Sequence, residues 1–238
     1  MATARLAEVE PVAAVPFHLS EAWARCWAGA YGARPAVDVP AGEARLRLML
    51  EEGRLGPLRF PLLTSATNLQ TCYFDLEDEA PADALATLPG RLLETGAAQV
   101  RIDWLEAKSA LLAAARNWGG RVIVEPFAVS PLADCRGGLD AYLARAGSSV
   151  RKYMRACRRH ILNGPIAFEI IRGGPGLGAL VEEMLALEAA GWKGREGTAI
   201  LSKPEDARFY RALAPAAAEA GALRIALLRE EGRLIAYE

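Results

Sequence analysis

The chain has 238 residues, of which 52% are hydrophobic, enough for a folded core and too many for a disordered chain. Its 28 basic and 29 acidic side chains nearly cancel. No global field therefore attracts DNA or an anionic membrane, and we expect no DNA partner.

Metal and secretion signals are weak in this sequence. The four cysteines form no Cys-x-x-Cys pair, and only two histidines are available, so we expect no metal site and reduced thiols: Cys26, Cys72, Cys135 and Cys157, with His18 and His160. The first 20 residues mix Glu and Pro and lack the apolar run of a signal peptide. Charges interrupt every apolar segment, so we expect no transmembrane segment and a cytoplasmic protein.

The first half of the chain alternates between helix and strand patterns. A helix is expected over residues 20–30, because Ser20 can cap it and Trp23 and Trp27 lie one turn apart. Residues 45–50 and 58–63 are β-like runs joined by an acidic, Gly-containing turn, which is typical of a hairpin. The next expected elements are a strand, a helix, a strand, a helix and a strand, at 71–76, 81–95, 99–105, 109–118 and 121–129.

This alternation predicts an α/β fold with a mixed sheet. In the second half we expect a long helical stretch at 139–161 that is interrupted by Gly147, then further elements. These are a strand, two helices and two strands, at 166–172, 177–192, 205–221, 222–229 and 233–238. The last strand has no following partner, and an open edge leaves backbone groups unpaired, so we expect a fragment.

Two segments carry a family resemblance. The order strand, helix, helix, hairpin is the opening order of the GNAT fold. SSVRKYMRACRR at 148–159 resembles the serine-then-basic helix of GNAT-like proteins akin to the cellulose-biosynthesis-associated acetyltransferases. EAAGWKGREGTAI at 188–200 resembles the E-x-x-x-W-K-G-x-x-G-T-A segment of the same group. The similarity covers roughly residues 130–238.

The resemblance implies two tandem GNAT-like α/β domains with mixed sheets. Residues 1–138 would form a degenerate first domain, as in FemAB-type aminoacyltransferases. Residues 139–238 would form the first half of an acetyltransferase domain that is incomplete at its C-terminus. The strand that would supply an oxyanion-stabilising amide lies outside this sequence.

The implied activity is transfer of an acyl group from acetyl-CoA or another acyl-CoA. The acceptor would be a small molecule or a cell-envelope or polysaccharide-related compound, which attacks the thioester directly. Two alternatives stand beside it. One is a FemAB-like aminoacyltransferase that uses aminoacyl-tRNA, and the other is a non-catalytic binding protein on a decayed GNAT fold.

In a GNAT domain the loop after the first helix usually borders the acceptor. By the resemblance, that loop holds Trp192, Lys193, Gly194, Gly197 and Thr198. An indole can hold an apolar or sugar-like acceptor, and a lysine can pair with a carboxylate or phosphate. The alternative is structural, with Trp192 as an apolar plug and Lys193 as a cation favoured at the helix C-terminus.

Glu188 lies four residues before Trp192 and shares its helix face. A carboxylate there, with its pKa raised by burial, could act as general base for an amine. The alternative is an ordinary exposed or cap-pairing glutamate.

A basic run follows the serines of the first segment. Arg151, Arg155 and Arg158 share one helix face, with Lys152 and Arg159 on a neighbouring face. The run could bind the phosphates of CoA, of a nucleotide-linked acceptor or of tRNA. A solvated face or a clamp between domains is the alternative.

Two further patterns are poor candidates for sites. The loop GGPGLG at 173–178 precedes a helix, but its spacing differs from G-x-G-x-x-G and Pro175 removes one amide, so a flexible loop is the better interpretation. Cys157 and His160 are close enough on one helix to touch, yet such a pair is far more often incidental.

Overall fold

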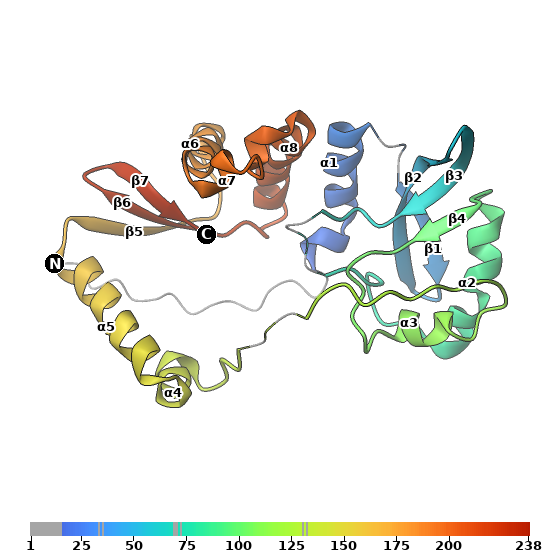
Figure 1. Cartoon of the computed structure of the whole chain (residues 1–238), viewed down its shortest axis with the longest axis horizontal. Coiled ribbons are helices and arrows are strands. Elements are labelled where there is room, and N and C mark those ends of the chain that lie inside the picture. The colour runs from blue at the N-terminus through green and yellow to red at the C-terminus, as the bar shows by residue number, and fades with distance from the viewer. Residues whose placement is uncertain are drawn as a thin grey trace. The chain divides into compact units, whose positions relative to one another are not determined.

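The computed structural model describes residues 16–32, 34, 36–68, 71, 73–129, 131 and 133–238. The first 15 residues, for which no signal peptide is predicted, and Cys72, for which a reduced thiol is predicted, lie outside the described residues. The chain forms two compact units, each with its own sheet (Figure 1). Unit 1 holds the residues up to Ile123 together with 203–222, and unit 2 holds 124–202 together with 223–238.

Unit 1 is built on a four-stranded sheet in the order β1-β2-β3-β4. The strands β1, β2 and β3 pair antiparallel and β4 joins β3 in parallel, so the predicted mixed sheet is confirmed for this unit. Its elements are η1 (Phe17–Leu19), α1 (Glu21–Tyr31), β1 (Ala36–Ala41), β2 (Ala44–Leu55), β3 (Leu58–Thr64), α2 (Ala82–Glu94), β4 (Gln99–Arg101), α3 (Ala110–Ala115) and α8 (Pro204–Glu219).

The first helix is confirmed, together with its cap. The Ser20 hydroxyl accepts a hydrogen bond from the Trp23 amide at 3.3 Å, and Gly32 ends the helix at a φ of 69°. The core of unit 1 lies between the sheet and α2, where Leu46, Leu63 and Leu88 are fully buried. The helices expected at 81–95 and 109–118 are confirmed as α2 and α3.

The hairpin turn lies within the predicted connection of residues 51–57 but is shorter. Glu51, Glu52 and Gly53 belong to β2, and the turn falls at Gly56 and Pro57. Gly53 pairs with Phe60 on β3. The Phe60 ring covers Gly53 so closely that a Cβ added at Gly53 would lie 2.4 Å from it. An aromatic side chain that covers a strand glycine replaces the missing side-chain packing, so the glycine does not break the strand.

Several other strand predictions for the first half of the chain are corrected. Residues 121–129 form no strand, although they are rich in β-branched residues, because no neighbouring strand pairs with them and Pro126 has no amide to donate. Residues 71–76 contribute only a bridge from Phe74 to Leu105 among the described residues. The strand expected at 99–105 ends at Arg101, and β1 was not predicted.

An aromatic cluster joins α1 and α8 within unit 1. The Phe209 ring is fully buried, with its centroid 4.8 Å from that of Trp23 and 5.4 Å from that of Trp27. Tyr31 donates a hydrogen bond to Asp206, and Arg208 donates to the Ala30 carbonyl at 2.8 Å. Thus α8, which falls within residues 139–238, packs in unit 1. The division into tandem domains at residue 138 stays a prediction.

Unit 2 is a three-stranded antiparallel sheet, β5-β6-β7, with helices before and between its strands. Its elements are α4 (Gly138–Arg145), α5 (Ser148–Asn163), β5 (Ile166–Ile171), α6 (Leu177–Ala190), α7 (Trp192–Arg195), η2 (Ile200–Ser202), β6 (Ile225–Glu230) and β7 (Arg233–Tyr237). The predicted interruption at Gly147 is confirmed, since α4 ends at Arg145 and α5 begins at Ser148.

Helix α6 packs on this sheet (Figure 1). Apolar residues of α6, including Leu180 and Met184, cover the buried side chains of Ile225 and Leu227 on β6. Glu183 on α6 accepts two hydrogen bonds from Arg229 on β6, at 2.9 and 2.6 Å. The helix is therefore fixed to the sheet, and the segment that follows it starts from a defined position.

Candidate functional site

The segment that follows α6 turns back onto the end of that helix. Gly191 ends α6, and the single helical turn α7 follows at once. A Cβ at Gly194 would lie 1.7 Å from the Ala189 carbonyl oxygen and 2.6 Å from its carbonyl carbon. Backbone cannot yield as a flexible side chain can, so the close approach of α7 to α6 requires glycine at this position.

Glu188 holds the rest of this segment in place. One of its oxygens accepts a hydrogen bond from the Lys193 ammonium at 2.6 Å, and the other accepts from the Ile200 amide at 2.8 Å. Its side chain is only 8% exposed. Both hydrogen bonds are charge-assisted and partly buried, so this one carboxylate fixes both Lys193 and Ile200 of the segment to α6. We call residues 191–200 the clamped loop.

A second set of bonds closes the clamped loop around the Lys193 carbonyl. That oxygen accepts hydrogen bonds from the Thr198 amide at 2.9 Å, the Ala199 amide at 3.2 Å and the Thr198 hydroxyl at 3.4 Å. Gly197 supplies the left-handed turn between them, with a φ of 69°. Ala199 and Ile200 are buried, so the loop ends inside the protein.

The clamped loop presents a tryptophan to its surroundings. Trp192 is 58% exposed, whereas the Lys193 side chain is 37% exposed and already paired with Glu188. An ammonium has three donors, so Lys193 keeps two that Glu188 does not use. The arrangement offers a ligand an indole face with a positioned cation beside it in sequence.

The charge of the Glu188 carboxylate also acts on Tyr237 of β7. Burial raises the pKa of Tyr237, and the negative charges of Glu188 and Glu238 raise it further. The charge of Glu188 therefore acts at the end of β7 as well as in the clamped loop. Neither the Tyr237 interaction nor the Ile200 bond was predicted, since both depend on residues far apart in sequence.

The five cations of α5 form a separate group. They are Arg151, Lys152, Arg155, Arg158 and Arg159. The Arg151 guanidinium donates to the Ala146 carbonyl, and Arg155 donates to the Arg151 carbonyl at 3.2 Å. Within the described part of the chain none of the five has an acidic partner or a bond to the clamped loop. Their charge is therefore available to an external anion.

The two weaker candidates receive simple structural explanations. Gly173, Gly174 and Gly176 have φ values of 141°, 106° and 86°, and they form the turn that starts α6. A hydrogen bond with the Cys157 thiol raises the pKa of Tyr153, so that thiol interacts with a residue one turn before it.

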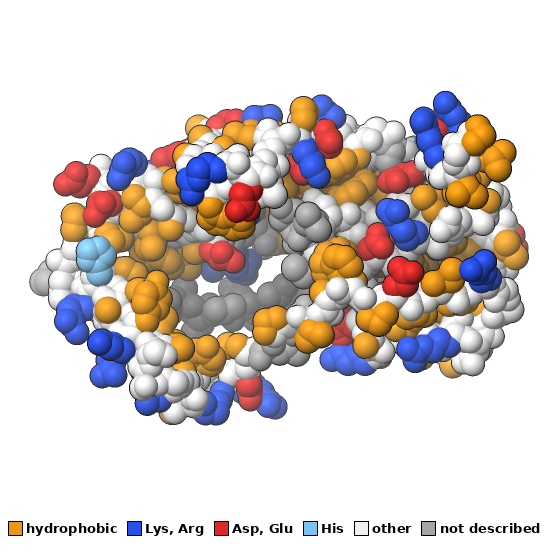
Figure 2. Space-filling view, viewed as in Figure 1, with side chains coloured by type: hydrophobic (Ala, Val, Ile, Leu, Met, Phe, Trp, Pro, Cys, Tyr) orange, Lys and Arg blue, Asp and Glu red, His pale blue; other side chains and the backbone are white. Residues whose placement is uncertain are grey.

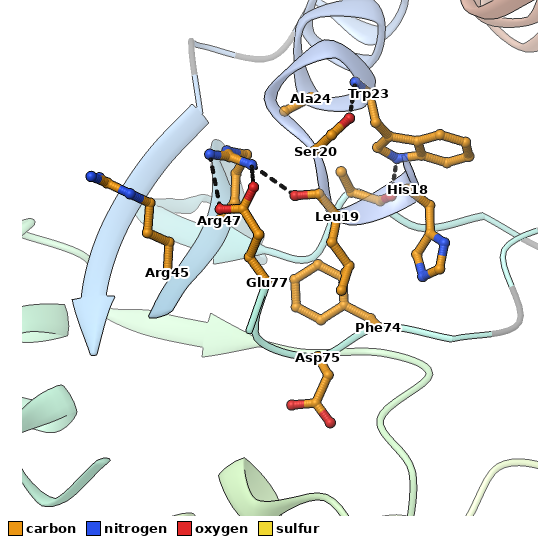
Figure 3. A pocket seen from close by; sticks show the side chains of 11 residues that line it. His18, Leu19, Ser20, Trp23, Ala24, Arg45, Arg47, Phe74, Asp75 and Glu77 are labelled. Atoms are coloured by element: carbon orange, nitrogen blue, oxygen red, sulfur yellow. Dashed lines mark hydrogen bonds and ion pairs between the residues drawn. The ribbon is translucent and has the colours of Figure 1, made fainter. Parts of the chain in front are cut away.

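A small hollow in unit 1 is built around a buried arginine (Figure 3). Arg47 donates to Asp38 at 2.8 and 3.1 Å and to the Leu19 carbonyl at 2.7 Å, and it lies near Glu77. The hollow has a volume of about 10 Å³, which suits one water molecule and no cofactor. Arg47 therefore stabilises the fold, and sequence alone did not distinguish it from Arg45 in the same strand.

The described residues offer neither a candidate metal site nor a helix that could span a membrane. Among the described residues, no cluster of three or more His, Cys, Asp or Glu side chains could hold a metal ion. None of the helices described is long and apolar enough to cross a bilayer.

Comparison with known proteins finds one similarity, in the second part of the chain. Residues 148–238 match the family model described as an acetyltransferase (GNAT) domain. The match starts with α5 and includes Glu188 and the whole clamped loop. No curated protein and no solved structure matches the chain. The match supports the predicted GNAT superfamily, while the cellulose-biosynthesis-associated or FemAB-like type stays a prediction.

Proposed function

We propose that this protein is an acyl-CoA-dependent N-acyltransferase whose acceptor borders the clamped loop. The observation that carries the proposal is the position of that loop. It lies inside the stretch that matches an acetyltransferase (GNAT) domain, and two strong bonds to Glu188 fix it. A GNAT domain supports acyl transfer in general, and the clamped loop supports a defined acceptor-side surface.

In this proposal Trp192 provides the main contact to the acceptor. Its exposed indole offers a flat apolar face and one hydrogen-bond donor, which suit a sugar ring or an apolar amine. Lys193 adds a cation for an acceptor carboxylate or phosphate. Gly194, Gly197 and Thr198 shape the backbone around them, since each takes part in the close turn of the loop.

Glu188 has two proposed roles that an experiment can separate. As a positioning residue it holds Lys193 and the Ile200 amide, and both of its oxygens are used in this way. As a general base it would have to accept a proton from the acceptor amine. We favour positioning, because both carboxylate oxygens already accept hydrogen bonds within the protein, one from Lys193 and one from the Ile200 amide.

Acetyl-CoA or another acyl-CoA would supply the activated acyl group. The cations of α5 are the candidates for its phosphates, but all five lie on one helix and none of them is buried. We therefore derive no step through the acyl-CoA, and the residues of the clamped loop are proposed for the acceptor alone.

The test uses the purified protein. Acetyl-CoA should raise the melting temperature, because a ligand that binds only the folded state stabilises it. A panel of amines and amino sugars should then release the CoA thiol, which a thiol reagent measures. Absence of both a melting shift and thiol release would leave the aminoacyl-tRNA or binding-protein alternative.

A Glu188→Gln variant separates the two roles of that residue. If Glu188 positions the loop, the acceptor KM rises and the acidic limb of the pH–rate profile is kept. If Glu188 is the base, kcat falls and the acidic limb disappears. Glu182→Gln, six residues earlier on α6, is the matched control.

A further inference from the structure

Helix α5 separates its charge from its apolar side chains. With about 100° between successive residues, its five cations fall within one continuous arc of about a third of the circumference. Five residues share the opposite side: Val150, Tyr153, Met154, Cys157 and Ile161. The helix is therefore amphipathic, with one basic face and one apolar stripe.

The apolar stripe of α5 is incompletely covered, since Met154, Cys157 and Ile161 are half-buried and Val150 and Tyr153 are exposed. Val150 is 41% exposed and Tyr153 is 69% exposed, and no described side chain of α5 is buried. On α6, by contrast, Val181 and Leu185 are almost fully buried. Figure 2 shows basic side chains along one edge of α5 and apolar side chains on its other side.

Nothing within α5 neutralises its charge. Residues 148–163 contain no Asp or Glu. The near-zero net charge of the whole chain does not cancel this local field, because salt screens exposed charges over roughly 10 Å. A basic face opposite an incompletely covered apolar stripe is the pattern of helices that lie in the plane of a membrane surface.

We propose that α5 binds an anionic lipid surface. The apolar stripe enters the boundary between headgroups and acyl chains, and the cations contact the lipid phosphates. A nucleic acid would use the basic face alone and would leave the stripe exposed to water, so lipid accounts for both faces. This binding goes beyond acyl transfer and does not depend on it.

The first test is co-sedimentation with vesicles of phosphatidylcholine, alone or mixed equally with phosphatidylglycerol. We expect binding to the mixed vesicles to be at least about tenfold stronger, because anionic lipids attract basic segments. Both Arg155→Glu/Arg158→Glu and Val150→Ser/Met154→Ser should reduce it about tenfold, while Arg91→Glu on α2 should leave it unchanged. Circular dichroism checks that each variant is folded.

The second test locates the stripe directly. An environment-sensitive dye on Cys157, with Cys26, Cys72 and Cys135 replaced by Ser, should shift to the blue on mixed vesicles. The same dye on Lys152→Cys, with Cys157 also replaced, should shift much less, since that position lies on the basic face. Equal shifts at the two positions, binding that ignores the Val150/Met154 substitutions, or no binding would each overturn the proposal.

Discussion

Helices α6 and α5 lie in the same unit and differ in how they are held. Helix α6 buries apolar side chains against the sheet, is bonded to β6 through Glu183 and Arg229, and ends in the clamped loop. Helix α5 buries none of its described side chains and has no acidic partner for its cations. Helix α6, which is held by the rest of its unit, can position a site. Helix α5, which is incompletely covered, has surface available for an external partner.

The largest expected effect concerns the turn from α6 into α7. Gly194→Ala places a Cβ against the Ala189 backbone, so the clamped loop must separate from α6. We expect a loss of about 3 kcal/mol in the free energy of unfolding, measured with denaturant. Gly178→Ala on α6 is the control, since a Cβ there meets nothing within 4 Å, and it should stabilise by about 0.5 kcal/mol. Equal effects would mean that the close approach is unimportant.

Loss of the Glu188 carboxylate comes next. Glu188→Ala leaves the Ile200 amide without its acceptor and Lys193 without its partner, and we expect a cost of about 1–3 kcal/mol. Amide exchange at residues 196–200 should accelerate more than exchange within α6. If exchange rose equally in both, Glu188 would not be specific to the clamped loop.

The ionisation of Tyr237 gives a smaller, pH-dependent effect. Because its pKa is raised in the folded state, the unfolded chain loses the phenol proton at a lower pH than the folded chain. Stability is then unaffected below the ordinary tyrosine pKa of about 10 and falls as the pH rises above it. Tyr237→Phe should flatten this fall, and Glu188→Gln should reduce it only in part, because burial is the larger cause.

The smallest effects on stability are expected for α5. Arg155→Glu/Arg158→Glu and Val150→Ser/Met154→Ser should each change the free energy of unfolding by less than about 0.5 kcal/mol, since neither set is buried. A loss of several kcal/mol in thermal or denaturant unfolding would show that α5 is held as α6 is, and the contrast between the two helices would fail.

Sequence patterns predicted the elements whose signals are local. The Ser20 cap, the break at Gly147 and the periodic pattern of α6 each depend on neighbouring residues, and the structure has them. Residues 121–129 misled the prediction, because a β-branched run becomes a strand only where another strand pairs with it. The packing of α8 on α1 depends on Phe209 and residues about 180 positions earlier, which no local pattern shows.

The sequence predicted which residues belong to the candidate site, but not the contacts that hold them in place. The resemblance of the W-K-G and G-T-A segments predicted the residues of the clamped loop, and the family match includes these segments. In the structure these segments are held in place by the close approach of Gly194 to Ala189 and by the two hydrogen bonds that Glu188 accepts. A sequence shows residue types at fixed spacing, but it does not show which carboxylate oxygen meets which donor.

The acceptor KM of Trp192→Ala, measured at saturating acetyl-CoA, tests the central claim most directly. Phe127→Ala, which removes another exposed aromatic ring of unit 2, is the matched control. We predict that Trp192→Ala raises the acceptor KM about tenfold or more while acetyl-CoA binding is kept, and that Phe127→Ala changes neither. An unchanged acceptor KM in Trp192→Ala would contradict the assignment of the clamped loop to the acceptor.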